Sequence, residues 1–195
     1  MELRERLVGM REELLEELKE FLRMPSVSAR EDGGGAFREC AEWVLGKLEE
    51  AGARARLLET GGHPVVYAEA GEGEGALLSY GHYDVQPPEP LELWESDPFE
   101  PAIRGDRLYA RGVADDKGDV LARIQALRIY LREHGELPFR LRFLIEGEEE
   151  VGSPSLGPFV RENAGLLSAD ACLWEGSIKD EAGRPVIFCG TKGLA

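Results

Sequence analysis

Apolar side chains recur every three or four residues in several stretches of the chain, and this period is typical of amphipathic helices. In the first stretch, the apolar positions are Leu3, Leu7, Met10, Leu14, Leu18 and Phe21. The pattern predicts helices over residues 2–22, 37–48, 116–134 and 155–162. Gly52 and Gly135 follow the second and third of these helices, where a glycine cap would end each one.

Short apolar runs lie between the predicted helices and indicate buried β-strands. These runs cover residues 55–58, 64–69, 76–80, 139–145, 171–174 and 186–189, and two shorter pieces at 102–104 and 107–109 flank a turn. Because helices and apolar strands alternate, we expect an α/β domain with a mostly parallel sheet. Residues 81–111 contain five prolines and no clear helix or long strand, a pattern that is typical of functional loops.

Composition narrows the range of partners. The chain has 195 residues, of which 43% are hydrophobic, and a formal net charge of −15, which disfavours nucleic acid and anionic membranes as partners. Cys40, Cys172 and Cys189 have no C-x-x-C spacing, so we expect small buried thiols in a reducing compartment. With no signal-like apolar segment and no span long enough for a membrane helix, we expect a cytoplasmic protein.

Six residues with metal-binding or acid–base side chains follow predicted strands or begin a predicted helix. They are His82, Asp84, Asp115, Glu149, Glu150 and Glu175. In α/β sheets, ligands bind at the carboxyl ends of the strands, so the topology is expected to gather these groups at one edge. Hard carboxylates together with one imidazole suggest a hydrolytic site for zinc or a related divalent metal.

The residue types also suggest how such a site would work. A two-metal hydrolase needs a bridging carboxylate, end ligands on each ion and a base for the attacking water. Asp115 suits the bridge because its short side chain is held stiffly, and His82 suits an end ligand whose tautomer Asp84 would fix. In the pair Glu149-Glu150, one carboxylate can bind metal while its neighbour stays free as the base.

Each of these patterns also has a structural explanation that involves no metal. Asp115 or Asp116 can simply cap a helix, and the acidic run at residues 148–150 can be a solvated turn. His63 is expected to be exposed in a loop and His134 to lie in the last turn of a helix, so neither is assigned to the metal. A calcium-binding module is a weaker alternative, because the chain lacks the acidic loop spacing of such sites.

Four collinear segments resemble the M20 metallopeptidases. They are GHYDVQP at 81–87, WESDPF at 94–99, YARGVADDKG at 109–118 and EGEEEVGS at 146–153. Within that family they most resemble the dipeptidase branch, which includes the cytosolic carnosine-type dipeptidases, and the similarity runs over essentially the whole chain. The resemblance implies a three-layer sandwich in which helices flank the central sheet, as in zinc-peptidase catalytic domains.

The same resemblance implies two divalent ions, zinc in the first place and manganese or cobalt as alternatives. The implied activity is hydrolysis of the amide bond of dipeptides or small N-acyl amino acids by a water that bridges the two ions. A cis peptide bond is expected between Asp115 and Asp116. The implied roles are metal binding by His82, Asp115, Glu150 and Glu175, with Asp115 as the bridge, orientation of His82 by Asp84, and general base catalysis by Glu149.

The family pattern extends beyond the segments found in this chain. We therefore expect residues 1–195 to be the N-terminal part of the catalytic domain. A lid domain, used for homodimer formation, and a returning segment with a further metal-binding histidine are expected to lie outside this sequence. The alternative function is a catalytically silent domain that keeps the scaffold and uses its acidic cleft for binding or assembly.

Overall fold

A five-stranded sheet organises the computed structural model, which describes residues 3–29, 35–176 and 178–186. The strand order is β1-β2-β6-β3-β7, with bounds Arg54–Leu58, Val65–Ala70, Arg140–Glu146, Ala76–His82 and Ala171–Leu173. β3 pairs in parallel with β6 and β7, whereas β2 pairs antiparallel with β1 and β6. Only β2 therefore runs against the others, which confirms the predicted α/β class with a mostly parallel sheet.

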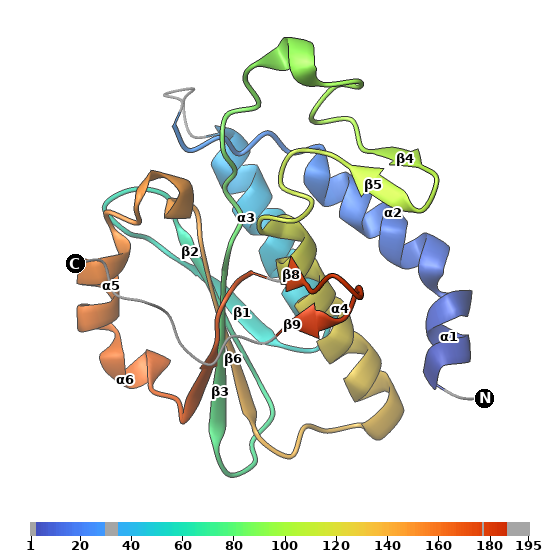
Figure 1. Ribbon diagram of the computed structural model, residues 1–195. Coiled ribbons are helices and arrows are strands. Elements are labelled where there is room, and N and C mark those ends of the chain that lie inside the picture. The colour runs from blue at the N-terminus through green and yellow to red at the C-terminus, as the bar shows by residue number, and fades with distance from the viewer. Residues whose placement is uncertain (1–2, 30–34, 177, 187–195) are drawn as a thin grey trace.

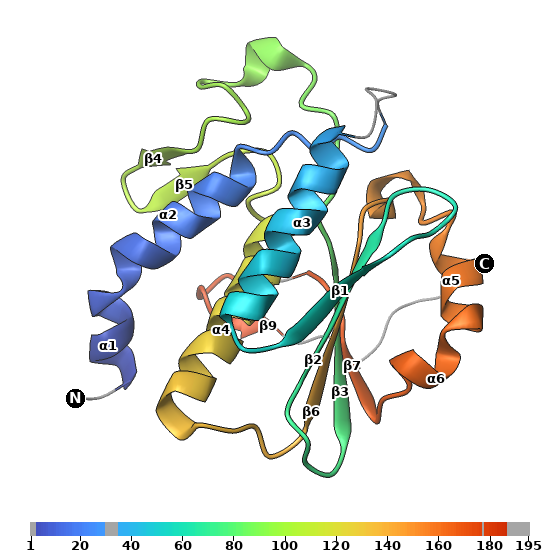
Figure 2. The ribbon, with the colours of Figure 1, turned by 180° about the vertical axis from the view of Figure 1, so that it is seen from behind.

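Helices cover both faces of this sheet, as Figures 1 and 2 show from opposite sides. On one face lie the longer helices α2 (Arg11–Leu22), α3 (Gly35–Glu50) and α4 (Lys117–His134), with α1 (Leu3–Gly9) preceding them. The other face carries the short helices α5 (Leu156–Glu162) and α6 (Ala164–Leu167). The result is the three-layer sandwich that the family resemblance implies.

The core follows from the two-residue period of the strands. Val66 and Ile145 face α3 and α4 in the larger apolar cluster, whereas their neighbours Val65 and Leu144 belong to the smaller cluster beneath α5 and α6. Because both faces of β2 and of the second half of β6 are covered, residues 65–68 and 143–145 are continuous apolar runs in the sequence. Burial on both sides fixes the register and with it the residues that reach the carboxyl edge.

The predicted loop at residues 81–111 forms an arm that begins at the carboxyl end of β3 (Figure 1). It holds a short 3-10 helix, η1 (Leu91–Leu93), and a hairpin of β4 (Ala102–Arg104) and β5 (Arg107–Tyr109), so the two predicted strand pieces are confirmed. Val85 anchors the start of the arm because its backbone N–H donates to the Ser26 carbonyl at 2.8 Å.

Several predicted boundaries and environments were wrong. The helix predicted over 2–22 breaks at Met10, next to the poor helix former Gly9, and β3 continues beyond Tyr80 to His82. Cys172 is exposed because β7 is the edge strand, whereas Cys40 is buried as predicted. His63 is half-buried because its ring stacks on Phe37 with centroids 3.6 Å apart.

The chain ends with a small hairpin and a segment outside the described residues. The hairpin consists of β8 (Ile178–Lys179) and β9 (Pro185–Val186), and most of the strand predicted over 186–189, with Cys189, lies outside the described part. Among the described helices, none is both long and apolar enough to cross a lipid bilayer.

Candidate metal centre

The carboxyl edge of the sheet collects the predicted site residues. His82 ends β3 and pairs in register with Glu146, which ends β6, so the acidic run at 148–150 begins just beyond the same edge. Glu175 lies two residues after β7, and Asp115 lies two residues before α4. The topology therefore brings four separate segments to one place, as the strand-end rule predicts.

His82 is the buried centre of this group. Its Nε2 lies 2.9 Å from Asp115 Oδ1, 3.5 Å from Glu175 Oε2 and 3.9 Å from Glu149 Oε2. Burial alone would disfavour the imidazolium, but the hydrogen bond and charge of Asp84 and the nearby carboxylates outweigh it and raise the pKa of His82 to about 10. The imidazole thus lies in a strongly negative pocket that favours a cation at Nε2.

Asp84 joins the histidine to the acidic run. His82 Nδ1 lies 3.0 Å from the backbone carbonyl of Asp84 and 3.3 Å from its Oδ1. The two carboxylate oxygens of Asp84 also accept the backbone N–H groups of Glu149, at 3.2 Å, and Glu150, at 3.1 Å. Burial opposes ionisation here, but the bond to His82 and the other donors lower the pKa of Asp84 below its usual value.

Two groups of three side chains could each hold an ion, because their ligand atoms lie within 4.8 Å of one another. They are His82 with Asp115 and Glu150, and His82 with Asp116 and Glu175. Glu150 is further held by Gln86, whose Nε2 donates to its carboxylate at 2.7 Å. All of the predicted ligands therefore lie around one histidine.

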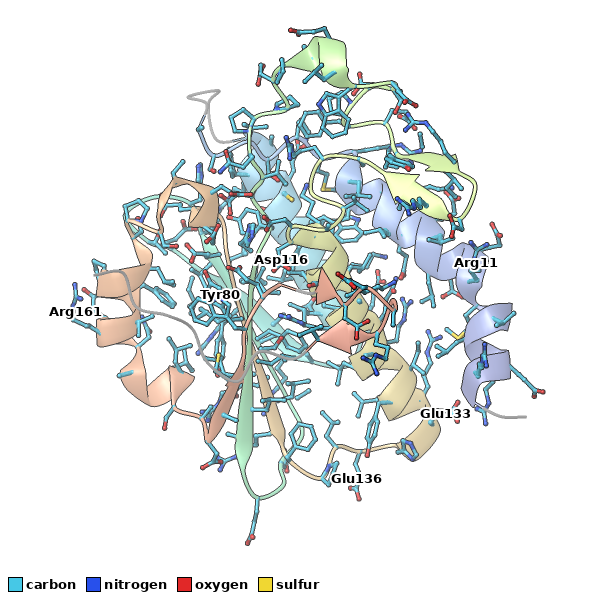
Figure 3. All side chains as sticks on the ribbon, in the orientation of Figure 1. Arg11, Tyr80, Asp116, Glu133, Glu136 and Arg161 are labelled. Carbon is cyan, nitrogen blue, oxygen red and sulfur yellow. The ribbon has the colours of Figure 1, made fainter. Side chains whose placement is uncertain are left out.

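Asp116 is a potential metal ligand that the sequence analysis did not assign to the site. It occupies the N-cap position of α4 but makes no side-chain cap bond. Instead its buried Oδ2 accepts the backbone N–H of His82 at 3.1 Å, and the expected cis peptide bond joins it to Asp115. Tyr80 and Asp116, labelled in Figure 3, lie well inside the molecule, whereas Arg11 and Arg161 project from the outer helices α2 and α5.

The donor set fits a divalent cation. Glu175 Oε2 and Asp116 Oδ1 are buried and have no hydrogen-bond partner among the described residues. Burial is the main cause that raises the pKa of each of these two carboxyls to about 7, although the positive charge of His82 opposes the shift. A buried carboxylate without a partner is costly, and a bound cation would supply the missing charge. One imidazole with hard oxygen donors suits zinc and similar ions.

Two glycines make the close approaches of this site possible. A Cβ at Gly81 would lie 2.5 Å from Asp116 Oδ2, and a Cβ at Gly147 would lie 2.4 Å from the ring of Tyr83. Tyr83 is itself fixed, because its hydroxyl donates to the Pro64 carbonyl at 2.7 Å. Side chains larger than hydrogen would therefore push apart β3, α4 and the start of the acidic run.

Comparisons with known proteins show what the chain resembles. A model of peptidase family M20/M25/M40 matches residues 78–187. A cysteinylglycine-S-conjugate dipeptidase of Corynebacterium striatum is 34% identical over 97% of this chain and 42% of its own length. A succinyl-diaminopimelate desuccinylase of Xylella fastidiosa is 39% identical over 65% of this chain and 32% of its own length. An M20 family metallo-carboxypeptidase from Sulfolobus solfataricus superposes with a TM-score of 0.81 and 42% identity, covering 88% of this chain and 39% of that one.

Fold and site together define an α/β protein with a potential metal-binding cluster at the carboxyl edge of its sheet. The family match covers more than half of the chain and includes every predicted site residue, so the chain belongs to peptidase family M20/M25/M40. The resemblance seen in the sequence motifs is thereby confirmed. The chain spans 42% and 32% of the lengths of the two curated relatives.

Proposed function

We propose that this chain carries the metal-binding part of an amide hydrolase that acts on dipeptides. The observation that supports this proposal best is that carboxylates from three other segments gather around His82 in two groups of three residues, each with its ligand atoms within 4.8 Å of one another. The inner side of the cluster is shielded from solvent, because His82 is fully buried and Asp116 nearly so.

In this proposal two divalent ions, most favourably zinc, would be held by His82, Asp115, Glu150 and Glu175, and Asp115 would serve both ions. When bound, such ions would acidify a water and polarise the substrate carbonyl. Asp84 would keep the imidazole of His82 oriented through Nδ1, leaving Nε2 for the ion. The exposure of Asp115, whose side chain is 72% accessible, leaves the outer side of the cluster open to substrate.

Glu149 is our candidate for the general base. Its carboxylate reaches to 3.9 Å from His82 Nε2, so it borders the cluster without belonging to either group of potential ligands. Its backbone is held by Asp84, which fixes the carboxylate beside the place where water would be activated. We propose that Glu149 accepts the proton of the attacking water and later delivers it to the leaving amine.

The favoured substrate class is the dipeptide, with small N-acyl amino acids as the second candidate. The likeness to the dipeptidase extends over 97% of this chain, whereas the likeness to the desuccinylase covers 65%. The broader likeness includes the arm and the helices that frame the cluster, so we favour the dipeptide. Both substrates present an amide carbonyl to the same cluster, and the choice between them depends on groups farther from it.

The experiment that tests this proposal combines metal analysis with turnover of the complete gene product. We expect about two zinc ions per chain and release of amino acids from dipeptides. Changing Glu149→Gln should lower turnover about 10²–10⁴-fold while the ions remain bound. The neighbouring Glu148→Gln is the matched control and should keep turnover near that of the unaltered protein.

A catalytically silent domain predicts a different result. A stable protein that binds no divalent ion and hydrolyses neither dipeptides nor N-acyl amino acids would contradict the hydrolase and favour the silent domain. Equal losses of turnover in the Glu148→Gln and Glu149→Gln variants would contradict the role of Glu149 as general base but not the hydrolase proposal.

A further inference from the structure

Arg123 links two strands at the point where their backbone pairing stops. The parallel ladder between β3 and β7 ends with the pair Ser79 and Leu173, so the next residues in register are Tyr80 and Trp174. From α4, the guanidinium of Arg123 donates to both of these backbone carbonyls, through Nη1 to Tyr80 at 2.6 Å and through Nη2 to Trp174 at 2.7 Å. The guanidinium of Arg123 thus bridges the first residue pair beyond the end of the ladder.

The side chains of the same pair add a second restraint. The rings of Tyr80 and Trp174 stack with centroids 4.1 Å apart. Tyr80 is itself held because its hydroxyl donates to the buried Glu146 carboxylate at 2.6 Å. Trp174 is therefore fixed through its carbonyl by Arg123 and through its ring by Tyr80, even though 58% of its surface is exposed.

These restraints act directly on the next residue, Glu175. Its Oε2 lies 3.5 Å from His82 Nε2 and has no hydrogen-bond partner within the described part of the chain. The position of this carboxylate therefore depends on Trp174, whose side chain hydrogen-bonds to it, and on the backbone that leads to it. Because β7 has only three residues, the ladder alone gives that backbone little support.

We propose that Arg123 is a positioning residue that keeps Glu175 in place as a metal ligand by clamping the carbonyl of Trp174 to that of Tyr80. This inference rests on the proposed function of the metal centre. The clamp requires the planar fork of arginine, since one guanidinium offers two parallel donors and a lysine ammonium is a single point. Arg123→Lys should therefore weaken metal binding almost as much as Arg123→Met does.

The test is a metal titration of the complete gene product against a competing chelator, with thermal unfolding of the metal-free form recorded alongside. In Arg123→Met and in Arg123→Lys, we expect the affinity for one of the two ions to fall about 10–100-fold, the usual effect of losing a group that orients a ligand. The affinity for the other ion should stay the same. Arg132→Met, at an exposed position of the same helix, should leave both affinities unchanged.

Two further variants separate positioning from general stability. Arg128→Met removes a buried ion pair between α2 and α4 and should lower the unfolding temperature without a selective loss of one ion. In a Glu175→Gln background, Arg123→Met should change metal affinity less than twofold further, because residues that act as one unit are not additive.

The outcomes distinguish this inference from the function on which it rests. Unchanged affinities in Arg123→Met, or a full additional loss in the Glu175→Gln background, would overturn the inference while leaving the hydrolase proposal intact. An unaltered protein that binds no divalent ion would overturn both.

Discussion

At the scale of single residues, Asp84 connects the two halves of the site. Its carboxylate accepts the N–H groups of Glu149 and Glu150, and it lies beside His82 Nδ1. One buried side chain thus sets both the orientation of the imidazole and the position of the acidic run. A carboxylate is suited to this task because each of its two oxygens can accept a hydrogen bond.

Changing Asp84→Asn should therefore lower both the stability of the acidic run and the metal affinity of His82. The amide has one acceptor oxygen, so one of the two backbone N–H groups loses its partner, at a cost of about 1–3 kcal/mol. Metal affinity should fall about 10–100-fold because His82 is no longer oriented. Calorimetric metal titration and denaturant unfolding would measure the two effects. Asp97→Asn, which alters a similar bond in an exposed turn, should leave metal affinity unchanged.

Gly147 allows a second prediction at this scale. A methyl group at this position would overlap the ring of Tyr83, which cannot withdraw because it is buried and hydrogen-bonded. We expect Gly147→Ala to lower the free energy of unfolding by about 1–3 kcal/mol. Gly46→Ala in α3 is the matched control, because it has open space and should raise stability by about 0.5–1 kcal/mol. Equal effects of the two changes in urea unfolding would contradict this explanation.

The gathering of these residues could be predicted, but their contacts could not. Strand ends placed His82, Glu149 and Glu175 at one edge before any contact was known. The bond from the His82 backbone to Asp116 depends on where one side chain points at the start of a helix, and the sequence pattern equally permitted a cap. The contacts of Arg123 could not be predicted from the sequence, because an arginine on a helix is normally assigned to the surface.

At the scale of elements, α4 connects the site to the rest of the fold. Its bounds follow from the helical period, and the structure agrees closely with the predicted range 116–134. The period could not reveal that Lys117 is buried and donates to the carbonyls of Phe21 and Met24, at 3.0 and 2.6 Å. Charged residues are rarely buried without partners, and these partners come from the distant end of α2.

The ion pair between α2 and α4 predicts a pH dependence of stability. Glu17 accepts from Arg128 at 2.5 Å and from Gln125 at 2.9 Å, in a mostly buried position. Burial raises the pKa of Glu17, but these hydrogen bonds and charges outweigh it and leave the pKa below its usual value of 4.5. The pair therefore contributes fully above about pH 4.5, and its contribution is lost as the pH falls through the lowered pKa.

We expect Glu17→Gln to reduce the free energy of unfolding by about 1–3 kcal/mol at pH 7. The difference from the unaltered protein should shrink steadily below pH 4.5, the usual pKa of this carboxyl. Urea unfolding between pH 7 and about pH 3 would measure it. Glu20→Gln, on the exposed side of α2, should show almost no difference at any pH. A constant difference across the range would mean that the charge of Glu17 is not the cause.

At the scale of the whole molecule, the candidate metal centre closes the open edge of the sheet. The ends of β3, β6 and β7 and the start of α4 approach one another there, yet the groups that meet are mostly negative. Their mutual repulsion opposes folding at this edge unless a cation is present. The same cluster that is proposed to act on substrate should therefore also be a cross-link that holds the layers together.

Removing metal should consequently destabilise the entire fold. A ligand that binds only the folded state at 1,000 times its Kd stabilises that state by about 4 kcal/mol, and each kcal/mol shifts the unfolding temperature of a domain of this size by about 2–4 °C. We expect a chelator to lower the unfolding temperature of the metal-loaded protein by about 8–16 °C, as measured by calorimetry, and added zinc to restore it. In an Asp115→Asn variant the chelator should change little, because the carboxylate that is proposed to serve both ions is gone. An equal shift in that variant would place the stabilising ion elsewhere in the molecule.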